Sequence, residues 1–242
     1  MKFISYLLSP IFMLTFFLLL VVFQPLQWLS FNLFGLKGHK IVVDILNWFL
    51  VKSMLILWVP VRFENKHSLS KENNYIFVAN HQSLFDIPPL ILYLRKYSPK
   101  FVAKMELGKG IPSISYNLKY GGAALINRKD PRQALSALSS FAKRINSNKW
   151  SAVIFPEGTR SKTGKPKKFA TNGIKMIAKY NKEAFIVPIT INNSWKVYKY
   201  GKFPLGLGSP ITLKTHAPIK ITSLPFDELM VKVETIITSQ IK

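Results

Sequence analysis

The amino-acid sequence predicts an α/β fold, in which a mixed, largely parallel sheet is flanked by helices and preceded by an N-terminal membrane-embedded helical segment. Two observations carry this prediction. A run without any charged side chain extends over residues 3–36, and short apolar segments alternate with helix-like segments from about residue 59 onward. Continuous apolar strands between helices are typical of a sheet covered on both faces. We therefore expect a membrane anchor over residues 1–58 and an α/β domain over residues 59–242.

The uncharged run is too long for one straight helix across a bilayer. As a single helix, residues 3–36 would be about 50 Å long at ~1.5 Å per residue, against a hydrocarbon core of ~30 Å. Pro25 is predicted to divide the run, so that residues 3–24 can span alone and residues 26–36 lie at the interface. A second apolar stretch follows at 41–58. The anchor is therefore either one spanning helix with an interfacial one, or a shallow hairpin of two interfacial helices.

A cleaved signal peptide is the alternative for this N-terminus, because Lys2 precedes an apolar core. That core is followed by Phe-Gln-Pro-Leu-Gln-Trp rather than by a small-residue cleavage site, which favours a retained anchor. Lysines flank the anchor on both sides, so local charge orients it poorly. The long basic domain that follows favours the cytoplasmic side.

The α/β domain is predicted to contain seven short strands and five helices. The expected strands are 61–65, 75–80, 100–103, 123–127, 152–155, 184–191 and 210–214. The expected helices are 88–96, 109–119, 131–148, 169–180 and 227–241. The helix at 131–148 is the best marked, because Asp130 and Pro131 form a start signal. Its predicted apolar face is Leu135, Leu138, Phe141, Ala142 and Ile145.

The composition combines strong positive charge with high apolar content. There are 34 Lys+Arg against 11 Asp+Glu, a formal net charge of +23, and 48% of the residues are hydrophobic. A nucleic-acid binder explains the charge alone, whereas a protein on an anionic bilayer that handles an anionic substrate explains both properties. The lack of cysteine excludes disulfides, zinc–thiolate sites and a cysteine nucleophile, and the scarcity of histidines and acids argues against a metal centre.

The segment at 80–86, Asn-His-Gln-Ser-Leu-Phe-Asp, lies between a predicted strand and a predicted helix. Such a turn is where α/β proteins place reactive groups. Asp86 follows His81 by five residues, so its carboxylate can fold back onto one imidazole nitrogen and leave the other free to take a proton. The alternative is a structural histidine with Asp86 as a helix N-cap, and for this pair alone that alternative is the stronger.

A second polar segment, Phe-Pro-Glu-Gly-Thr-Arg at 155–160, follows the apolar residues 152–154. Gly158 permits a tight turn or close approach to a ligand. Thr159 and Arg160 offer a hydroxyl and a fork of donors suited to phosphate, and Glu157 can accept from a substrate hydroxyl. An ordinary Pro-Gly turn with a solvated arginine is the alternative, but it does not explain the lysines that crowd 162–168.

Two further cations come at the ends of predicted strands. Arg128 ends the segment 121–128, Gly-Gly-Ala-Ala-Leu-Ile-Asn-Arg, and Lys104 follows the strand at 100–103. Val-Pro-Ile at 187–189 interrupts an apolar strand with a proline, which favours a sheet edge or a bend. Each of these signals is weak alone.

In this order, the segments resemble the four blocks of the glycerophospholipid acyltransferase family, and most closely its bacterial members that acylate 1-acyl-sn-glycerol 3-phosphate. His81 and Asp86 match the family pattern of Asn-His, four variable residues and Asp, and the Phe-Pro-Glu-Gly-Thr-Arg block matches without a change. The arginine block departs at Leu125, where the family usually has Phe, and at Asn127, often Asp. The resemblance covers roughly residues 60–215.

The resemblance implies a reaction and a set of roles. A fatty acyl chain passes directly from a thioester, acyl-CoA or acyl carrier protein, to the sn-2 hydroxyl of 1-acylglycerol 3-phosphate and forms phosphatidic acid. His81 is the general base and Asp86 holds its imidazole. The substrate-binding residues are Lys104, Arg128 and Arg160 for the lipid phosphate, and Glu157, Gly158 and Thr159 around the acceptor. No cofactor or metal is expected, and no nucleic-acid partner. The expected location is the cytoplasmic face of a bacterial inner membrane.

Three other functions remain open at this point. A sister acyltransferase would use the same chemistry on a lysophospholipid, glycerol 3-phosphate or a lyso-aminolipid. A non-catalytic basic protein that binds anionic lipid or nucleic acid fits the charge but assigns no role to His81 and Asp86. A serine hydrolase lacks support, because there is no Gly-x-Ser-x-Gly elbow and Ser83 is too near His81 in sequence to be assumed a nucleophile.

Overall fold

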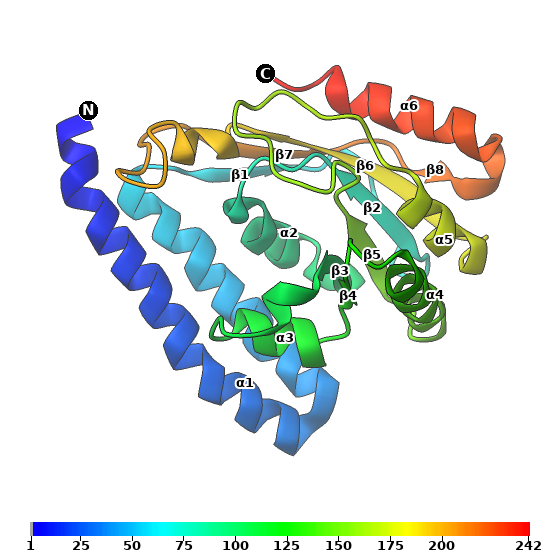
Figure 1. Ribbon diagram of the computed structural model, residues 1–242, viewed down its shortest axis with the longest axis horizontal. Coiled ribbons are helices and arrows are strands. Elements are labelled where there is room, and N and C mark those ends of the chain that lie inside the picture. The colour runs from blue at the N-terminus through cyan, green and yellow to red at the C-terminus, as the bar shows by residue number, and fades with distance from the viewer. Residues whose placement is uncertain (1) are drawn as a thin grey trace.

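A computed structural model describes residues 2–242, and its centre is one mixed, eight-stranded sheet (Figure 1). The strands are β1 (Val61–Glu64), β2 (Tyr75–Ala79), β3 (Pro99–Lys104), β4 (Ala124–Ile126), β5 (Ser151–Ile154), β6 (Phe185–Asn192), β7 (Ile211–Thr215) and β8 (Ile219–Lys220). The helices are α1 (Lys2–Ser53), α2 (Ile87–Tyr93), α3 (Ile114–Tyr120), α4 (Pro131–Ser147), α5 (Asn172–Tyr180) and α6 (Phe226–Thr238). Short 3₁₀ turns are η1 (Met54–Leu57), η2 (Leu84–Asp86), η3 (Arg95–Tyr97), η4 (Met105–Gly108), η5 (Ser194–Tyr198) and η6 (Ile221–Ser223).

The strand order is β1-β7-β6-β2-β5-β3-β4, with β8 pairing β6 beside β7. The five strands from β6 to β4 run parallel to their neighbours, and only the pairs of β6 with β7 and with β8 are antiparallel. The carboxyl ends of β2, β3, β4, β5 and β6 therefore meet at one edge of the sheet. This confirms the predicted α/β fold with its largely parallel sheet.

Each face of the sheet is covered by its own set of helices, as Figure 1 shows. Strand β2 explains why, because all five of its residues are buried and successive side chains point to opposite faces. Tyr75, Phe77 and Ala79 join the core under α1 and α2. Ile76 and Val78 join the core under α4, α5 and α6. The continuous apolar strand predicted from the sequence is the consequence of this burial on both sides.

The predicted helix at 131–148 is confirmed as α4. Its start signal works as expected, since the Asp130 carboxylate accepts a hydrogen bond of 3.0 Å from the backbone N–H of Gln133. Most of its predicted apolar face is buried, but Leu135 is 54% exposed and does not belong to the core. The predicted helices at 109–119 and 169–180 begin later than expected, at Ile114 and Asn172.

The N-terminal segment is a helical hairpin, which is one of the two predicted arrangements, but Pro25 does not divide it. Pro10 and Pro25 both lie inside helix, and the chain reverses at Gly35, where φ is 63° and ψ is −152°. The two arms, residues 2–34 and 36–53, lie side by side (Figure 1). The division at Pro25 is therefore wrong, because a proline removes one helical hydrogen bond and kinks the helix, whereas the positive φ of Gly35 turns the backbone around.

Substituting Gly35 tests this turn. A Cβ at position 35 would meet no atom within 4 Å, so any cost must come from the backbone conformation itself. We expect Gly35→Ala to lower the free energy of unfolding by about 1–3 kcal/mol, because this φ/ψ region is almost restricted to glycine. Thermal unfolding in neutral detergent measures the loss. The matched control, Ser30→Ala in the first arm, should change stability much less, and equal losses would contradict a special role of Gly35.

Of the edge or bend expected at Pro188, the edge is wrong, because strand β6 lies inside the sheet between β7 and β2. The β8 partner of β6 pairs with Phe185 and Ile186, and the β7 partner pairs from Ile189 onward. Pro188 thus sits where β6 changes its antiparallel neighbour, and its carbonyl still accepts a 2.9 Å hydrogen bond from the backbone N–H of His216. A missing N–H is tolerated at such a break in the ladder.

Candidate active site

The predicted pair of His81 and Asp86 meets at the carboxyl end of β2. Nδ1 of His81 lies 2.7 Å from Oδ2 of Asp86, whose side chain is fully buried. Since a carboxylate accepts, Nδ1 carries the proton and Nε2 has a free lone pair. Within residues 2–242, no protein group hydrogen-bonds to Nε2, and the His81 side chain keeps 16% of its surface exposed. This is the geometry of an oriented general base.

The buried Asp86 carboxylate is held by four donors. Oδ2 accepts from Nδ1 of His81 and from the backbone N–H groups of Gln82 and Ser83, at 2.7 and 2.9 Å. Oδ1 accepts from the hydroxyl of Ser194 in η5. These donors replace the water that a buried carboxylate loses, so the charge that orients His81 is compensated inside the protein.

The helix-cap alternative turns out to be part of the same arrangement. Ser83 caps η2, because its hydroxyl accepts from the Phe85 N–H while the Asp86 carboxylate accepts from the Ser83 backbone N–H, which together form a capping box. Asp86 makes no side-chain cap at the start of α2. The Asp86 carboxylate therefore both closes the turn at 83–86 and holds the His81 imidazole. The capping box fixes the position of the carboxylate relative to that imidazole.

Two neighbours fix the position of the His81 residue itself. The Asn80 side chain pairs with the Ile191 backbone in β6, with N–O distances of 2.8 and 2.7 Å, and so extends the β2–β6 pairing by one residue. The imidazole stacks on the ring of Phe155, with centroids 4.1 Å apart and planes inclined by 19°. His81 is thus held from its backbone and from one ring face.

Glu157 ties the two predicted motifs together. Its Oε1 accepts a 2.9 Å hydrogen bond from the backbone N–H of His81, and its Oε2 accepts one of 3.1 Å from the backbone N–H of Lys167. Burial raises the pKa of Glu157, and these two N–H groups oppose the rise by stabilising the carboxylate. The Glu157 carboxylate therefore holds the backbone of His81 in place. Its role toward an acceptor hydroxyl stays a prediction.

Arg128 and Gly158 are in direct contact. A guanidinium N–H of Arg128 donates to the Gly158 carbonyl. Gly158 has φ of 66°, so glycine serves the turn, whereas a Cβ there would meet the Arg128 guanidinium at 3.6 Å, an ordinary contact distance. Lys104 is exposed at the end of β3, where it pairs with Ile126, two residues before Arg128. These two cations thus lie on the same edge of the sheet as His81.

Thr159 and Arg160 are exposed in the loop that follows β5. The next residue, Ser161, donates its backbone N–H to the His81 carbonyl at 2.8 Å, which keeps this loop against the histidine turn. Burial raises the pKa of Tyr198, and the nearby Arg160 cation opposes that rise, so Arg160 lies on the η5 side of the site. The structure thus places Lys104 and Arg128 at the strand ends and Arg160 near Tyr198, while their role toward a phosphate stays a prediction.

The sequence does not indicate two of the residues that complete this site, Ser194 and Gln82. Ser194 lies 108 residues after Asp86 and donates to it, and Gln82 accepts from the Ser194 backbone N–H at 3.1 Å. Ser194 follows β6, so only its place after a parallel strand could have suggested it. Among residues 2–242, no group of three or more His, Cys, Asp or Glu side chains is arranged to hold a metal ion.

Comparison with known proteins identifies the family. The acyltransferase family model matches residues 60–192, more than half of the chain, and this range contains both motifs and Arg128. The chain belongs to the acyltransferase family.

Relatives within the family share one activity in their names. A 1-acyl-sn-glycerol-3-phosphate acyltransferase of Helicobacter pylori is 37% identical over 126 residues, which cover 51% of this chain and 50% of that protein. One from Borreliella burgdorferi is 27% identical over 194 residues and 76% of each chain. The chain spans half or less of the length of the first curated relatives that it matches, with 50%, 42% and 40% covered.

The fold is shared with a solved structure. The crystal structure of the 1-acyl-sn-glycerophosphate (LPA) acyltransferase PlsC from Thermotoga maritima superimposes with a TM-score of 0.80 and 24% identity. The match covers 99% of this chain and 95% of that one, so it includes the N-terminal hairpin as well as the α/β domain.

Proposed function

We propose that this protein is a 1-acylglycerol-3-phosphate O-acyltransferase that forms phosphatidic acid in phospholipid biosynthesis. The oriented His81 carries the proposal, since its Nδ1 donates to the buried Asp86 and its Nε2 has no hydrogen-bond partner among residues 2–242. The names of the curated relatives support the acceptor, and the cations at Lys104, Arg128 and Arg160 supply what its phosphate needs.

The chemical step follows from the free Nε2 of His81. This nitrogen takes the proton of the sn-2 hydroxyl as the oxygen forms a bond to the thioester carbonyl carbon. Asp86 stabilises the imidazolium that results. The tetrahedral intermediate then collapses, the carbon–sulfur bond breaks, and the proton passes from Nε2 to the departing sulfur. The products are phosphatidic acid and a free thiol, and no residue of the chain is acylated.

The proposed phosphate site is tested by removing Arg160. A hydrogen bond to a charged group contributes about 1.5–3 kcal/mol, so Arg160→Ala should raise KM for the acceptor about tenfold or more and change kcat little. Initial rates at several acceptor concentrations measure both constants. Lys162→Ala removes a nearby exposed cation and is the matched control. A KM that is no higher in Arg160→Ala than in this control would refute the phosphate role of Arg160.

The hairpin is proposed to anchor the chain in one leaflet, with residues 1–58 as the anchor and 59–242 as the catalytic domain. Its outer face carries exposed apolar side chains such as Phe3, Leu7, Leu14, Leu18, Leu29 and Phe34. The first arm packs on the domain along its length, since Ser9 accepts from the Leu205 N–H, Ser113 donates to the Leu20 carbonyl, and Phe31 contacts α3. A helix bound in this way does not leave the domain to cross a bilayer.

The location follows from the same anchor and from the substrates. The apolar N-terminal helix indicates membrane association. An acyl-CoA or acyl carrier protein donor is made in the cytoplasm, so we place the catalytic domain on the cytoplasmic face of a bacterial inner membrane. A hairpin in one leaflet lets a lysophosphatidic acid molecule reach His81 without leaving the lipid phase.

An acceptor panel tests the function. Purified full-length protein in neutral detergent is given one labelled acyl thioester, first as acyl-CoA and then on acyl carrier protein. The acceptors are 1-acylglycerol 3-phosphate, a lysophospholipid with a larger head group, and glycerol 3-phosphate. Labelled phosphatidic acid as the main product supports the proposal. A preference for another acceptor would reassign the substrate within the family, and no acceptor-dependent thiol release with either donor would favour a lipid-binding protein.

A further inference from the structure

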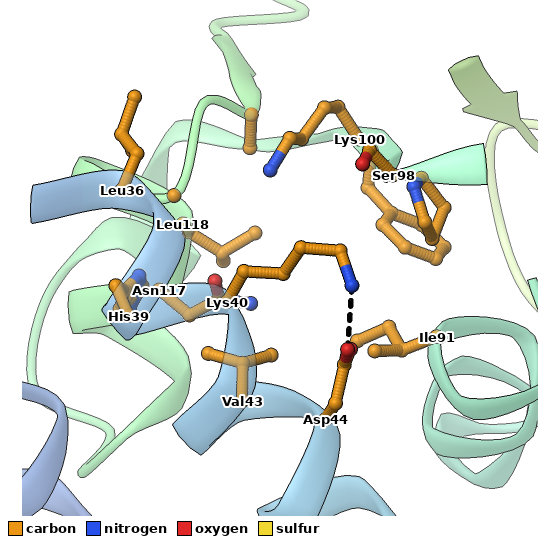
Figure 2. Close-up of a pocket in the computed structure, with 14 residues that line it drawn as sticks. Leu36, His39, Lys40, Val43, Asp44, Ile91, Ser98, Lys100, Asn117 and Leu118 are labelled. Atoms are coloured by element: carbon orange, nitrogen blue, oxygen red, sulfur yellow. Dashed lines mark hydrogen bonds and ion pairs between the residues drawn. The ribbon is translucent and has the colours of Figure 1, made fainter. Parts of the chain in front are cut away.

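A small pocket lies at the opposite end of the sheet from His81, between the second arm of the hairpin and the amino ends of β3 and β4. Its volume is about 40 Å³. Figure 2 shows Lys40 and Asp44 entering it from the helix and Lys100 entering it from the sheet, above Leu118 of α3. None of the residues in the proposed reaction lines this pocket, so its charged groups need another explanation.

The charges of the pocket do not balance. Lys40 pairs with Asp44 at 2.6 Å, and Asp44 is the sole acidic residue among the lining side chains. Within residues 2–242, Lys100 has no carboxylate at ion-pair distance, and its Nζ lies 4.7 Å from the centroid of the Trp150 ring instead. The pocket therefore carries one cation more than it neutralises.

The charged form of Lys100 is destabilised by its surroundings. Burial lowers its pKa to about 8, the neighbouring cations Lys40 and Arg144 lower it as well, and Asp44 opposes them. His39, which also lines the pocket, contributes no acceptor charge and its ring nitrogen lies 3.3 Å from the Gln27 amide oxygen. Lys100 is half-buried, and a partly desolvated cation without a counter-ion is unfavourable, so a bound anion would lower that penalty.

The size and the rim of the pocket indicate which anion. A volume of about 40 Å³ exceeds the roughly 10–15 Å³ that a cavity needs to admit one water molecule, so the pocket takes a small group such as a phosphate and not a whole lipid. Leu36 forms part of the rim and is 43% exposed, and it continues the exposed apolar surface of Leu33 and Phe34 at the hairpin turn. A phosphate held between Lys40 and Lys100 can thus have its acyl chains against the hairpin.

We propose that this pocket binds the phosphate head group of an anionic membrane lipid, separately from the acceptor phosphate at the active site. Lys100 and Lys40 supply the charge, and the acyl chains lie outside on the apolar surface at the turn. A lipid held here fixes the turn end of the hairpin to the layer of head groups, while the substrate site lies at the other end of the sheet. Free inorganic phosphate has the same chemistry, so the test separates the two sources.

The test variant is Lys100→Met, which keeps the length and apolar contacts of the side chain and removes its charge. Because the variant removes a half-buried cation that has no carboxylate partner, we expect its melting temperature in chloride to equal or exceed that of the wild type, and acyl transfer to be retained. Lys96→Met is the matched control, since Lys96 is an exposed lysine outside the pocket. Arg160→Ala serves as a second control, because it weakens the proposed acceptor phosphate site alone.

Two measurements on the full chain decide the proposal. The first is thermal unfolding in neutral detergent, with inorganic phosphate against chloride at equal ionic strength. The second is flotation with vesicles of phosphatidylcholine, with and without phosphatidylglycerol. We expect phosphate to raise the melting temperature of the wild type and Lys96→Met fully, that of Arg160→Ala through the pocket, and that of Lys100→Met clearly less than the wild type, since only its active-site phosphate site remains. Loss of a surface lysine weakens binding to anionic vesicles at most about fivefold, so Lys100→Met must weaken it tenfold or more.

Three outcomes would overturn the proposal. Phosphate stabilisation of Lys100→Met equal to that of the wild type means that the pocket does not bind phosphate. Reduced phosphate stabilisation with unchanged vesicle binding assigns the pocket to free phosphate and excludes the lipid. Equal loss of vesicle binding in Lys100→Met and Lys96→Met means that general surface charge, and not the pocket, binds the anionic lipid. None of these results bears on acyl transfer, which the acceptor panel tests separately.

Discussion

Replacement of His81 by alanine is expected to lower kcat/KM for acyl transfer by about 10²–10⁴-fold and to leave the fold intact. The loss follows because general-base help of this size depends on the free Nε2, and no other described side chain takes its place. The fold survives because Asp86 keeps three of its donors, from Gln82, Ser83 and Ser194. Transfer from a labelled thioester to 1-acylglycerol 3-phosphate gives the rate, and thermal unfolding in detergent gives the stability.

His67→Ala is the matched control for this variant, because His67 lies in the loop between β1 and β2, away from the motifs. It should transfer acyl chains at the wild-type rate. Wild-type activity in His81→Ala would contradict the assignment of His81 as the general base, and with it the proposed chemical step. Loss of activity together with loss of the melting transition would instead show that the imidazole is needed for folding.

The sequence predicts where the candidate residues lie because parallel strands end at a common edge. His81, Glu157, Arg128 and Lys104 each follow a segment that reads as a strand, and the topology then brings those strand ends together. The short spacing between His81 and Asp86 makes their contact a local matter of one turn. Both facts can be read without knowing the order of the strands in the sheet.

Contacts made across the sheet could not be predicted in this way. Ser194 reaches Asp86 only because β6 lies next to β2, and strand order is not encoded in any short segment. For the same reason, the sequence suggests Glu157 as a substrate ligand but does not predict that one of its oxygens accepts from the backbone N–H of His81 at the end of another strand. The sequence around a carboxylate does not show which hydrogen-bond donors surround it in the folded protein.

The anchor shows a different limit. Apolar length and composition identify the segment, but its shape depends on one backbone conformation, that of Gly35. Prolines are the more visible helix breakers in a sequence, and two of them lie inside the first arm without ending it. Which apolar side chains of the first arm face the domain is equally hidden, because residues 3–34 have no charged face and therefore offer no clear amphipathic stripe.

Asp86→Asn should have the second large effect, a fall of about 10²–10⁴-fold in kcat with the fold retained. The amide oxygen can accept from His81 and from the backbone N–H groups of Gln82 and Ser83, and the NH₂ group can donate to the Ser194 hydroxyl. The hydrogen-bonding pattern therefore survives, and the variant removes mainly the negative charge. Without that charge, the imidazolium formed as His81 takes the proton is no longer stabilised.

Ser194→Ala is the companion that separates charge from hydrogen bonding. It leaves the Asp86 carboxylate with its three donors to Oδ2 and removes the one donor to Oδ1. One hydrogen bond to a charged group is worth about 1.5–3 kcal/mol, so we expect a measurable loss of stability and about a tenfold fall in kcat. A fall in Asp86→Asn no larger than in Ser194→Ala would mean that Asp86 acts by holding the turn, and that its charge does not assist the proton transfer to His81.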